Sequence, residues 1–166
     1  IAVGFWNTVG AGLLGFSINT PIALYYMQGL NMTAAHGHAA LFGVYGMLGI
    51  GLMLFCLRGL VDRFAWSDAL LAKMFWFMNI GLAMMVFMSL VPAGIYQAVA
   101  AITKGMWFAR SPEVVHSAFM ENAVWMRVPG DIVFAIGCLF LALFALRLIG
   151  KAKQEETVSQ GVALEN

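Results

Sequence analysis

The charge-free stretches of this sequence constrain its fold more than any other feature. Residues 2–27 contain no Asp, Glu, Lys or Arg, and about 20 consecutive apolar residues are enough for a helix to cross a lipid bilayer. Only 10% of the 166 residues are charged, whereas 62% are hydrophobic. So few charges cannot cover the surface of a water-soluble globule. The sequence therefore predicts an all-α membrane protein and excludes an ordinary soluble domain.

Polar and charged turns divide the chain into about four predicted transmembrane helices, which together form one bundle over residues 1–150. We place these helices at 2–27, 33–57, 69–104 and 130–149. The fourth has an alternative start near residue 118, in which case Pro129 and Gly130 would interrupt it. Asn19-Thr20-Pro21 predicts a kink in the first helix. Residues 151–166 carry several charges and predict a polar tail, frayed in solvent and separate from the bundle.

The charges also limit the function and predict the orientation. Nine Lys and Arg against eight Asp and Glu leave a net charge of +1, which excludes the basic surface that nucleic-acid binding needs. Four crossings place six basic residues at one end and three at the other, and the richer end is predicted to be cytoplasmic, together with the C-terminus. The six are Arg58, Arg63, Lys73, Arg147, Lys151 and Lys153, and the three are Lys104, Arg110 and Arg127.

The two cysteines, Cys56 and Cys138, lie inside apolar runs. Such positions give no indication of a disulfide. We interpret both thiols as small hydrophobic side chains of the core. His116, by contrast, lies in a predicted aqueous loop, and we interpret it as a solvated side chain and not as a metal ligand.

The most informative residues are His36 and His38, because ionisable groups at membrane depth are costly and mark functional sites. Positions i and i+2 of a helix lie about 200° apart, so the two rings cannot share one metal ion as an i, i+4 pair does. They can each bind a separate metal on opposite flanks of the helix. Neutral imidazole is a common axial ligand of haem iron, and the helix is rich in glycine, which allows a flat ligand or a neighbouring backbone to approach. The alternative is that both histidines only hydrogen-bond to neighbouring helices.

Three segments resemble a known family. The run from Thr33 to Gly46, TAAHGHAALFGVYG, is similar to the helix that ligates both haems in the respiratory haem-copper oxidase superfamily, and Gly37 between the histidines resembles its nitric oxide reductase branch. The segments from Phe16 to Tyr26 and from Val124 to Asp131 resemble the same branch. The likeness covers about residues 5–150. It implies the C-terminal part of the catalytic subunit of a bacterial nitric oxide reductase, with the quinol-dependent form favoured over the cytochrome c-dependent form.

The resemblance also implies roles for the histidines. His36 would be the proximal ligand of a high-spin haem b, and His38 an axial ligand of a low-spin haem b that passes electrons to it. Members of this branch reduce nitric oxide to nitrous oxide at the high-spin haem and a non-haem iron. Their catalytic subunits have twelve or more helices, so this chain would correspond to a third or less of one. The ligands of the non-haem iron and the second ligand of the low-spin haem would lie outside it, and activity would require those missing helices.

Arg127 and Asp131 form an i, i+4 pair if the last helix begins before Pro129, with Glu121 one to two turns earlier. One interpretation is an ion pair that only fixes the start of the helix. In the other, Arg127 faces a haem propionate, or Asp131 helps to bind quinol near the low-spin haem. The sequence leaves these alternatives open.

The sequence therefore supports one leading function and two alternatives. The leading function is part of a nitric oxide reductase in the bacterial inner membrane, a respiratory oxidoreductase of denitrification, with quinol or cytochrome c as electron donor. Its partners would be membrane lipid and the remaining helices of the enzyme. The first alternative is a non-catalytic membrane anchor that carries haem b for electron transfer. The second is a cofactor-free subunit in which the histidines serve only for packing.

Overall fold

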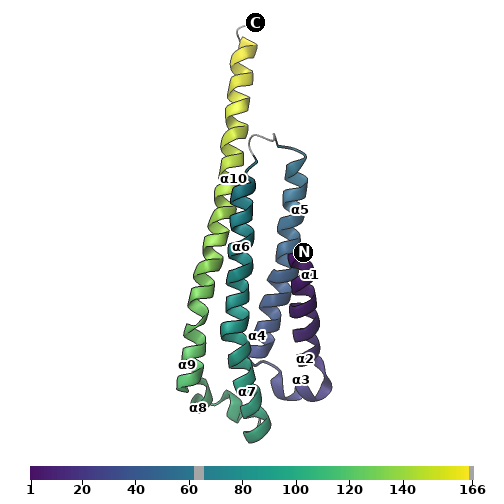
Figure 1. Ribbon diagram of the computed structural model, residues 1–166, viewed down its shortest axis with the longest axis vertical. Coiled ribbons are helices and arrows are strands. Elements are labelled where there is room, and N and C mark those ends of the chain that lie inside the picture. The colour runs from purple at the N-terminus through teal and green to yellow at the C-terminus, as the bar shows by residue number, and fades with distance from the viewer. Residues whose placement is uncertain (62–65, 165–166) are drawn as a thin grey trace.

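The structure is a computed structural model that describes residues 1–61 and 66–164, with side chains described as far as Lys151. Every regular element in those residues is a helix, and the long helices run side by side in a bundle (Figure 1). The all-α prediction with about four helices is confirmed. Among the described residues, three helices are long and apolar enough to cross a membrane, namely Asn31–Arg58, Asp68–Lys104 and Ala118–Lys151. The predicted loop residues Asp62 and Arg63, and the side chain of Lys153, lie outside what the structure describes.

The first apolar stretch is broken where a kink was expected. It comprises α1 (Ala2–Trp6), the π-helix η1 (Asn7–Leu14) and α2 (Gly15–Asn19), followed by α3 (Pro21–Met27). Thr20 between them is extended, with φ −61° and ψ 140°, because the proline ring disfavours helical geometry in the residue before it. Asn19, the last residue of α2, donates its side-chain amide to the carbonyl of Gly15 at 2.8 Å and so packs its side chain back along the helix.

We call each end-to-end run of helices that lies along the bundle a rod, and the helices α1, η1, α2 and α3 form the first rod. The second and third rods each contain a π-helical segment. The second comprises α4 (Asn31–Gly37), the π-helix η2 (His38–Gly46) and α5 (Met47–Arg58). The third comprises α6 (Asp68–Met84), the π-helix η3 (Met85–Leu90) and α7 (Val91–Lys104). The second rod begins at Asn31, two residues before the predicted start, where the backbone N–H and the side-chain amide of Asn31 both donate to buried Gln97, at 3.0 and 2.8 Å. π-Helical segments are rare and are frequent at functional sites.

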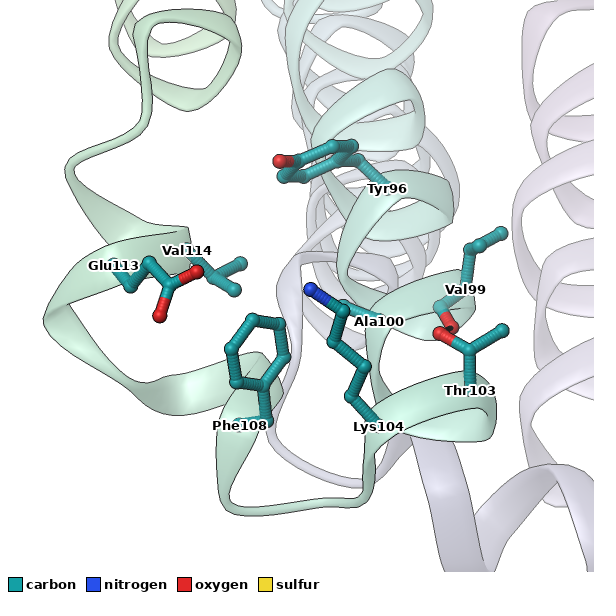
Figure 2. A pocket seen from close by; sticks show the side chains of 8 residues that line it. All are labelled: Tyr96, Val99, Ala100, Thr103, Lys104, Phe108, Glu113 and Val114. Atoms are coloured by element: carbon teal, nitrogen blue, oxygen red, sulfur yellow. Dashed lines mark hydrogen bonds between the residues drawn. The ribbon is translucent and has the colours of Figure 1, made fainter.

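Short helices connect the third rod to the fourth at the end of the bundle where α7 finishes. These are the 3₁₀-helix η4 (Phe108–Arg110) and α8 (Pro112–Val115), and a pocket lies between them and α7 (Figure 2). The fourth rod comprises α9 (Ala118–Trp125) and α10 (Arg127–Leu164). Pro129 stands in the first turn of α10, where no helical hydrogen bond needs its missing N–H. It therefore does not interrupt the helix.

The predicted frayed tail is helical in the structure. α10 continues to Leu164 and extends past the other rods (Figure 1). The residues that follow Gly150 include Lys, Ala, Gln and Glu, which are strong helix formers. The polar composition was therefore a poor guide to local structure in this segment.

Glycines allow two pairs of rods to approach closely. A Cβ on Gly81 would lie 2.5 Å from the backbone N of Phe134, and one on Gly130 would lie 2.8 Å from the backbone N of Met85, so α10 crosses the third rod at backbone contact. A Cβ on Gly43 in η2 would lie 2.5 Å from the buried side chain of Trp6 in α1, so there the glycine makes room for an indole. Small residues at such crossings are the usual means by which membrane helices pack.

The prediction for the cysteines was wrong. Cys56 and Cys138 are both free thiols, and both are exposed on the outside of the chain instead of lying in its core. In a membrane bundle the outward faces are as apolar as the inward ones, so hydrophobic surroundings in the sequence do not indicate which face is buried.

Candidate functional site

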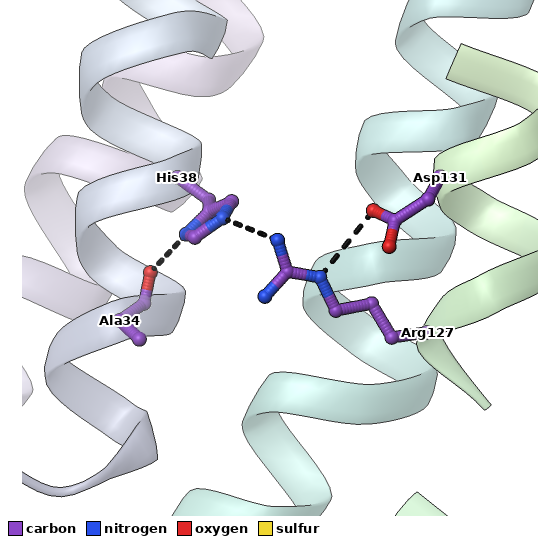
Figure 3. Close-up of polar contacts among 4 residues, drawn as sticks. All are labelled: Ala34, His38, Arg127 and Asp131. Atoms are coloured by element: carbon purple, nitrogen blue, oxygen red, sulfur yellow. Dashed lines mark hydrogen bonds and ion pairs between the residues drawn. The ribbon is translucent and has the colours of Figure 1, made fainter. Parts of the chain in front are cut away.

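The two histidine rings leave their helix in different directions. The Nδ1 of His36 lies 2.9 Å from the carbonyl oxygen of Gly10 in η1. The Nε2 of His38 lies 3.1 Å from the Nη2 of Arg127 in α10 (Figure 3). The first ring therefore faces the first rod and the second faces the fourth. This agrees with the i, i+2 spacing, which places the rings on separate flanks.

Both rings are held in the same tautomer. The Nδ1 of His38 lies 2.8 Å from the carbonyl oxygen of Ala34, as the Nδ1 of His36 does from that of Gly10. A carbonyl oxygen can only accept, so each Nδ1 must carry the hydrogen and donate it. The lone pair of each neutral ring is then on Nε2. This is the arrangement in which a second hydrogen bond orients a metal-ligating histidine.

The ring of His36 is half-buried against the first rod, and a glycine there makes room for it. A Cβ on Gly15 would lie 2.9 Å from the Cε1 of His36. Any larger residue at position 15 would therefore displace the imidazole. The break at Thr20 and the π-helix η1 lie on either side of this contact and determine how the first rod meets the ring.

Arg127 links His38 to Asp131. Its Nε lies 3.3 Å from the Oδ1 of Asp131, and its Nη2 donates to the Nε2 of His38 (Figure 3). The side chains of Arg127 and Asp131 are 37% and 47% exposed, so solvent screens their attraction and the pair adds little to stability. Because α10 begins at Arg127, both residues lie in its first turns and form the predicted i, i+4 pair.

A cavity of about 290 Å³ lies beside this group and opens to the outside of the chain. Apart from Arg127, Asp131 and the imidazole, its walls are apolar. The rings of Phe42 and Phe134 pack edge to face there, with centroids 4.7 Å apart. The lining residues are His38, Phe42, Leu82, Met85, Arg127, Asp131 and Phe134.

The other acidic and histidine residues do not join this site. His116 is exposed in the turn after α8, as expected, and Glu121 is exposed on α9. Among the described side chains, no group of three or more His, Cys, Asp or Glu residues is placed to hold a metal ion.

Sequence reasoning missed two polar pairs inside the bundle. The buried indole of Trp6 donates to the side-chain carbonyl of Asn79 at 2.9 Å, and Gln97 accepts from Asn31. Asn79 and Gln97 stand alone in apolar runs, and polar residues at membrane depth indicate an interhelical partner. That signal was present in the sequence.

Comparison with known proteins identifies the family. Residues 1–133 match the family described as Cytochrome C and Quinol oxidase polypeptide I. The chain belongs to this family, the haem-copper oxidases. It is also 30% identical over 157 residues to a subunit of the nitric oxide reductase of Stutzerimonas stutzeri, an alignment that covers 86% of this chain. The chain spans 30% of the length of that relative.

Membership of the haem-copper oxidases implies a haem, and the residues around His38 fit one. The Nε2 lone pair is free of hydrogen, and the walls of the cavity are apolar and partly aromatic, as a porphyrin face requires. The guanidinium of Arg127 supplies the positive charge that a haem carboxylate would need. Around His36 the fit rests on its tautomer alone, because the space beside Gly15 is occupied by the imidazole ring itself.

Proposed function

We propose that this chain supplies the axial histidines of two haems in a membrane-bound nitric oxide reductase. His36 would ligate a high-spin haem b and His38 a low-spin haem b. The observation that carries this proposal is that each Nδ1–H donates to a backbone carbonyl. The unprotonated Nε2 atoms therefore lie on different flanks of one helix, and that of His38 accepts a hydrogen bond from Arg127 that an iron ligand bond would replace.

The reaction is proposed from the similarity to the relative from Stutzerimonas stutzeri and from Gly37 between the histidines. Two nitric oxide molecules, two electrons and two protons give nitrous oxide and water. The haems supply electron transfer and a site for the substrate, together with a non-haem iron whose ligands we place outside this chain. The electrons come from quinol or cytochrome c, and we favour quinol. The enzyme would be a multi-pass protein of the bacterial inner membrane.

Arg127 and Asp131 have a supporting role in this proposal. When the Nε2 of His38 binds iron, it can no longer accept from Arg127, and the freed Nη2 can donate to a haem propionate. Asp131 holds the other side of the guanidinium in place. Asp131 could also accept a hydrogen bond from quinol, in which case Asp131→Asn would slow quinol-driven turnover more than turnover with an artificial donor. If Asp131 only pairs with Arg127, both activities would fall equally.

The test is a visible spectrum, oxidised and reduced, of the complete enzyme that contains this chain. His38→Ala should remove the low-spin haem signal and spare most of the high-spin signal. His36→Ala should leave the low-spin haem reducible and abolish nitric oxide reduction, because the active-site iron loses its protein ligand.

His116→Ala is the matched control, since that histidine is exposed and outside the site. It should leave both signals and the activity unchanged. Loss of one and the same haem in both the His36 and the His38 variants would refute the assignment of two haems. A single low-spin haem in the wild-type enzyme would favour an electron-transfer anchor. Full activity in either variant would favour packing, for which the existing bonds to Gly10, Ala34 and Arg127 already suffice.

A further inference from the structure

The pocket between α7, η4 and α8 lies at the depth where a membrane meets water. The predicted span Asp68–Lys104 ends at its edge, and Trp107, 82% exposed just beyond it, is the kind of residue that occupies the headgroup region. The cavity has a volume of about 220 Å³. It is at the end of the bundle opposite the C-terminus (Figure 1).

This pocket contains one positive and one negative side chain that do not pair with each other. The ammonium of Lys104 lies over the ring of Phe108, 4.4 Å from its centroid. Glu113 enters the pocket from α8 (Figure 2). Among the described side chains, neither Lys104 nor Glu113 forms an ion pair. The ammonium and the carboxylate can therefore each bind a ligand of opposite charge.

An apolar stripe runs from the pocket along α7 toward the middle of the membrane. Ile95, Val99 and Ile102 follow each other at i, i+4 and i+7, and each is more than half exposed, at 51%, 54% and 58%. Val99 also lines the pocket, so the charged site and the stripe are continuous. A ligand that fits both must be amphipathic.

We propose that this pocket binds the headgroup of a phospholipid whose only charged groups are a phosphate and a primary ammonium, that is, phosphatidylethanolamine. The phosphate accepts from Lys104, and the ammonium donates to Glu113. The aromatic walls formed by Tyr96 and Phe108 surround the glycerol region, and the acyl chains lie along the stripe. A primary ammonium has three N–H donors for the carboxylate, whereas a trimethylated one has none. The inference is independent of haem binding.

The test places the complete membrane protein in bilayer discs of equal parts phosphatidylethanolamine, phosphatidylglycerol and phosphatidylcholine, and measures retained lipid by native mass spectrometry. The wild type should retain phosphatidylethanolamine in preference to the other two. Lys104→Gln should reduce retention of all three lipids by up to about fivefold, the upper limit expected for one exposed charge pair. Glu113→Gln should remove the preference and keep most of the retention.

The chain offers matched controls. Lys73 also lies over a phenylalanine, 5.5 Å from the ring centroid of Phe140, but it does not line this pocket, so Lys73→Gln should retain lipid as the wild type does. Glu121→Gln controls for loss of a carboxylate near the same end. Equal retention of the three lipids by the wild type, or equal losses in the control variants, would overturn the proposal. Release of the lipid by added inorganic phosphate would also overturn it, because it would indicate a site for soluble anions.

Discussion

At the scale of single residues, Arg127 is the most informative residue to substitute, because it lies between a proposed haem ligand and a carboxylate. Its two contacts, to His38 at 3.1 Å and to Asp131 at 3.3 Å, place one positive and one negative charge close to the same imidazole. Charges near a redox centre alter its potential in a direction that depends only on their sign. Removing each charge in turn should therefore shift the midpoint potential of the proposed haem in opposite directions.

Arg127→Gln should lower the midpoint potential of the low-spin haem, because a nearby cation stabilises the reduced, electron-richer form. Asp131→Asn should raise it, because an anion destabilises that form. Each change should be on the order of tens of millivolts, and Asp131→Asn should cost less than about 1 kcal/mol in the free energy of unfolding, since the pair is half-exposed. Redox titration of the reduced haem band measures the shifts. Glu121→Gln should cause none, and shifts of the same sign in Arg127→Gln and Asp131→Asn would contradict the proposed location.

The sequence predicted the reactive residues better than their partners. The spacing of His36 and His38 was sufficient to send their rings to separate flanks, and the spacing of Arg127 and Asp131 was sufficient to pair them. The carbonyl of Gly10 could not be predicted as the acceptor for His36, because it is 26 positions away and depends on how two rods cross. Nor could the hydrogen bond from Arg127 to His38, which spans 89 positions.

At the scale of the helices, hydropathy predicted where the rods lie but not their internal geometry. The break at Thr20 follows from local chemistry, since the residue before a proline avoids the helical region. The π-helical segments η1, η2 and η3 have no such signature, because apolar composition is the same in an α-helix and a π-helix. The exposed positions of Cys56 and Cys138 were not predictable either, because the outward faces of a membrane bundle are as apolar as the inward ones.

The glycines provide a test of the helix crossings. Gly81→Ala should destabilise the protein by about 1–3 kcal/mol, because its Cβ would clash with the backbone of Phe134 and neither backbone can move easily. Gly49→Ala is the matched control, since nothing lies within 4 Å of a Cβ there. It should be neutral or stabilise the helix by up to about 1 kcal/mol. Thermal unfolding of the complete enzyme measures both, and equal stability of the two variants would mean that α6 and α10 are not in backbone contact.

At the scale of the whole molecule, the structure separates the basic residues into two ends. Arg58, at the end of α5, lies at the same end of the bundle as the later part of α10 (Figure 1). Lys104 and Arg127 lie at the other end, where α7 finishes and α10 begins. Because successive rods run in opposite directions, these basic residues lie at the two ends of the bundle that the sequence assigned to them. Which end faces the cytoplasm remains a prediction from that count.

Cysteine labelling can decide the orientation. Cys56 and Cys138 are exposed and must first be replaced by alanine, because both could react. On that background, Gln160→Cys, on the part of α10 beyond the bundle, should react with a membrane-impermeant thiol reagent only after the cells are opened. His116→Cys, in the turn after α8, should react in intact cells. This pattern follows because basic residues are retained on the cytoplasmic side during insertion, and the end that carries six of them should therefore stay inside. Labelling of Gln160→Cys but not of His116→Cys in intact cells would reverse the orientation and would place the proposed lipid pocket in the inner leaflet.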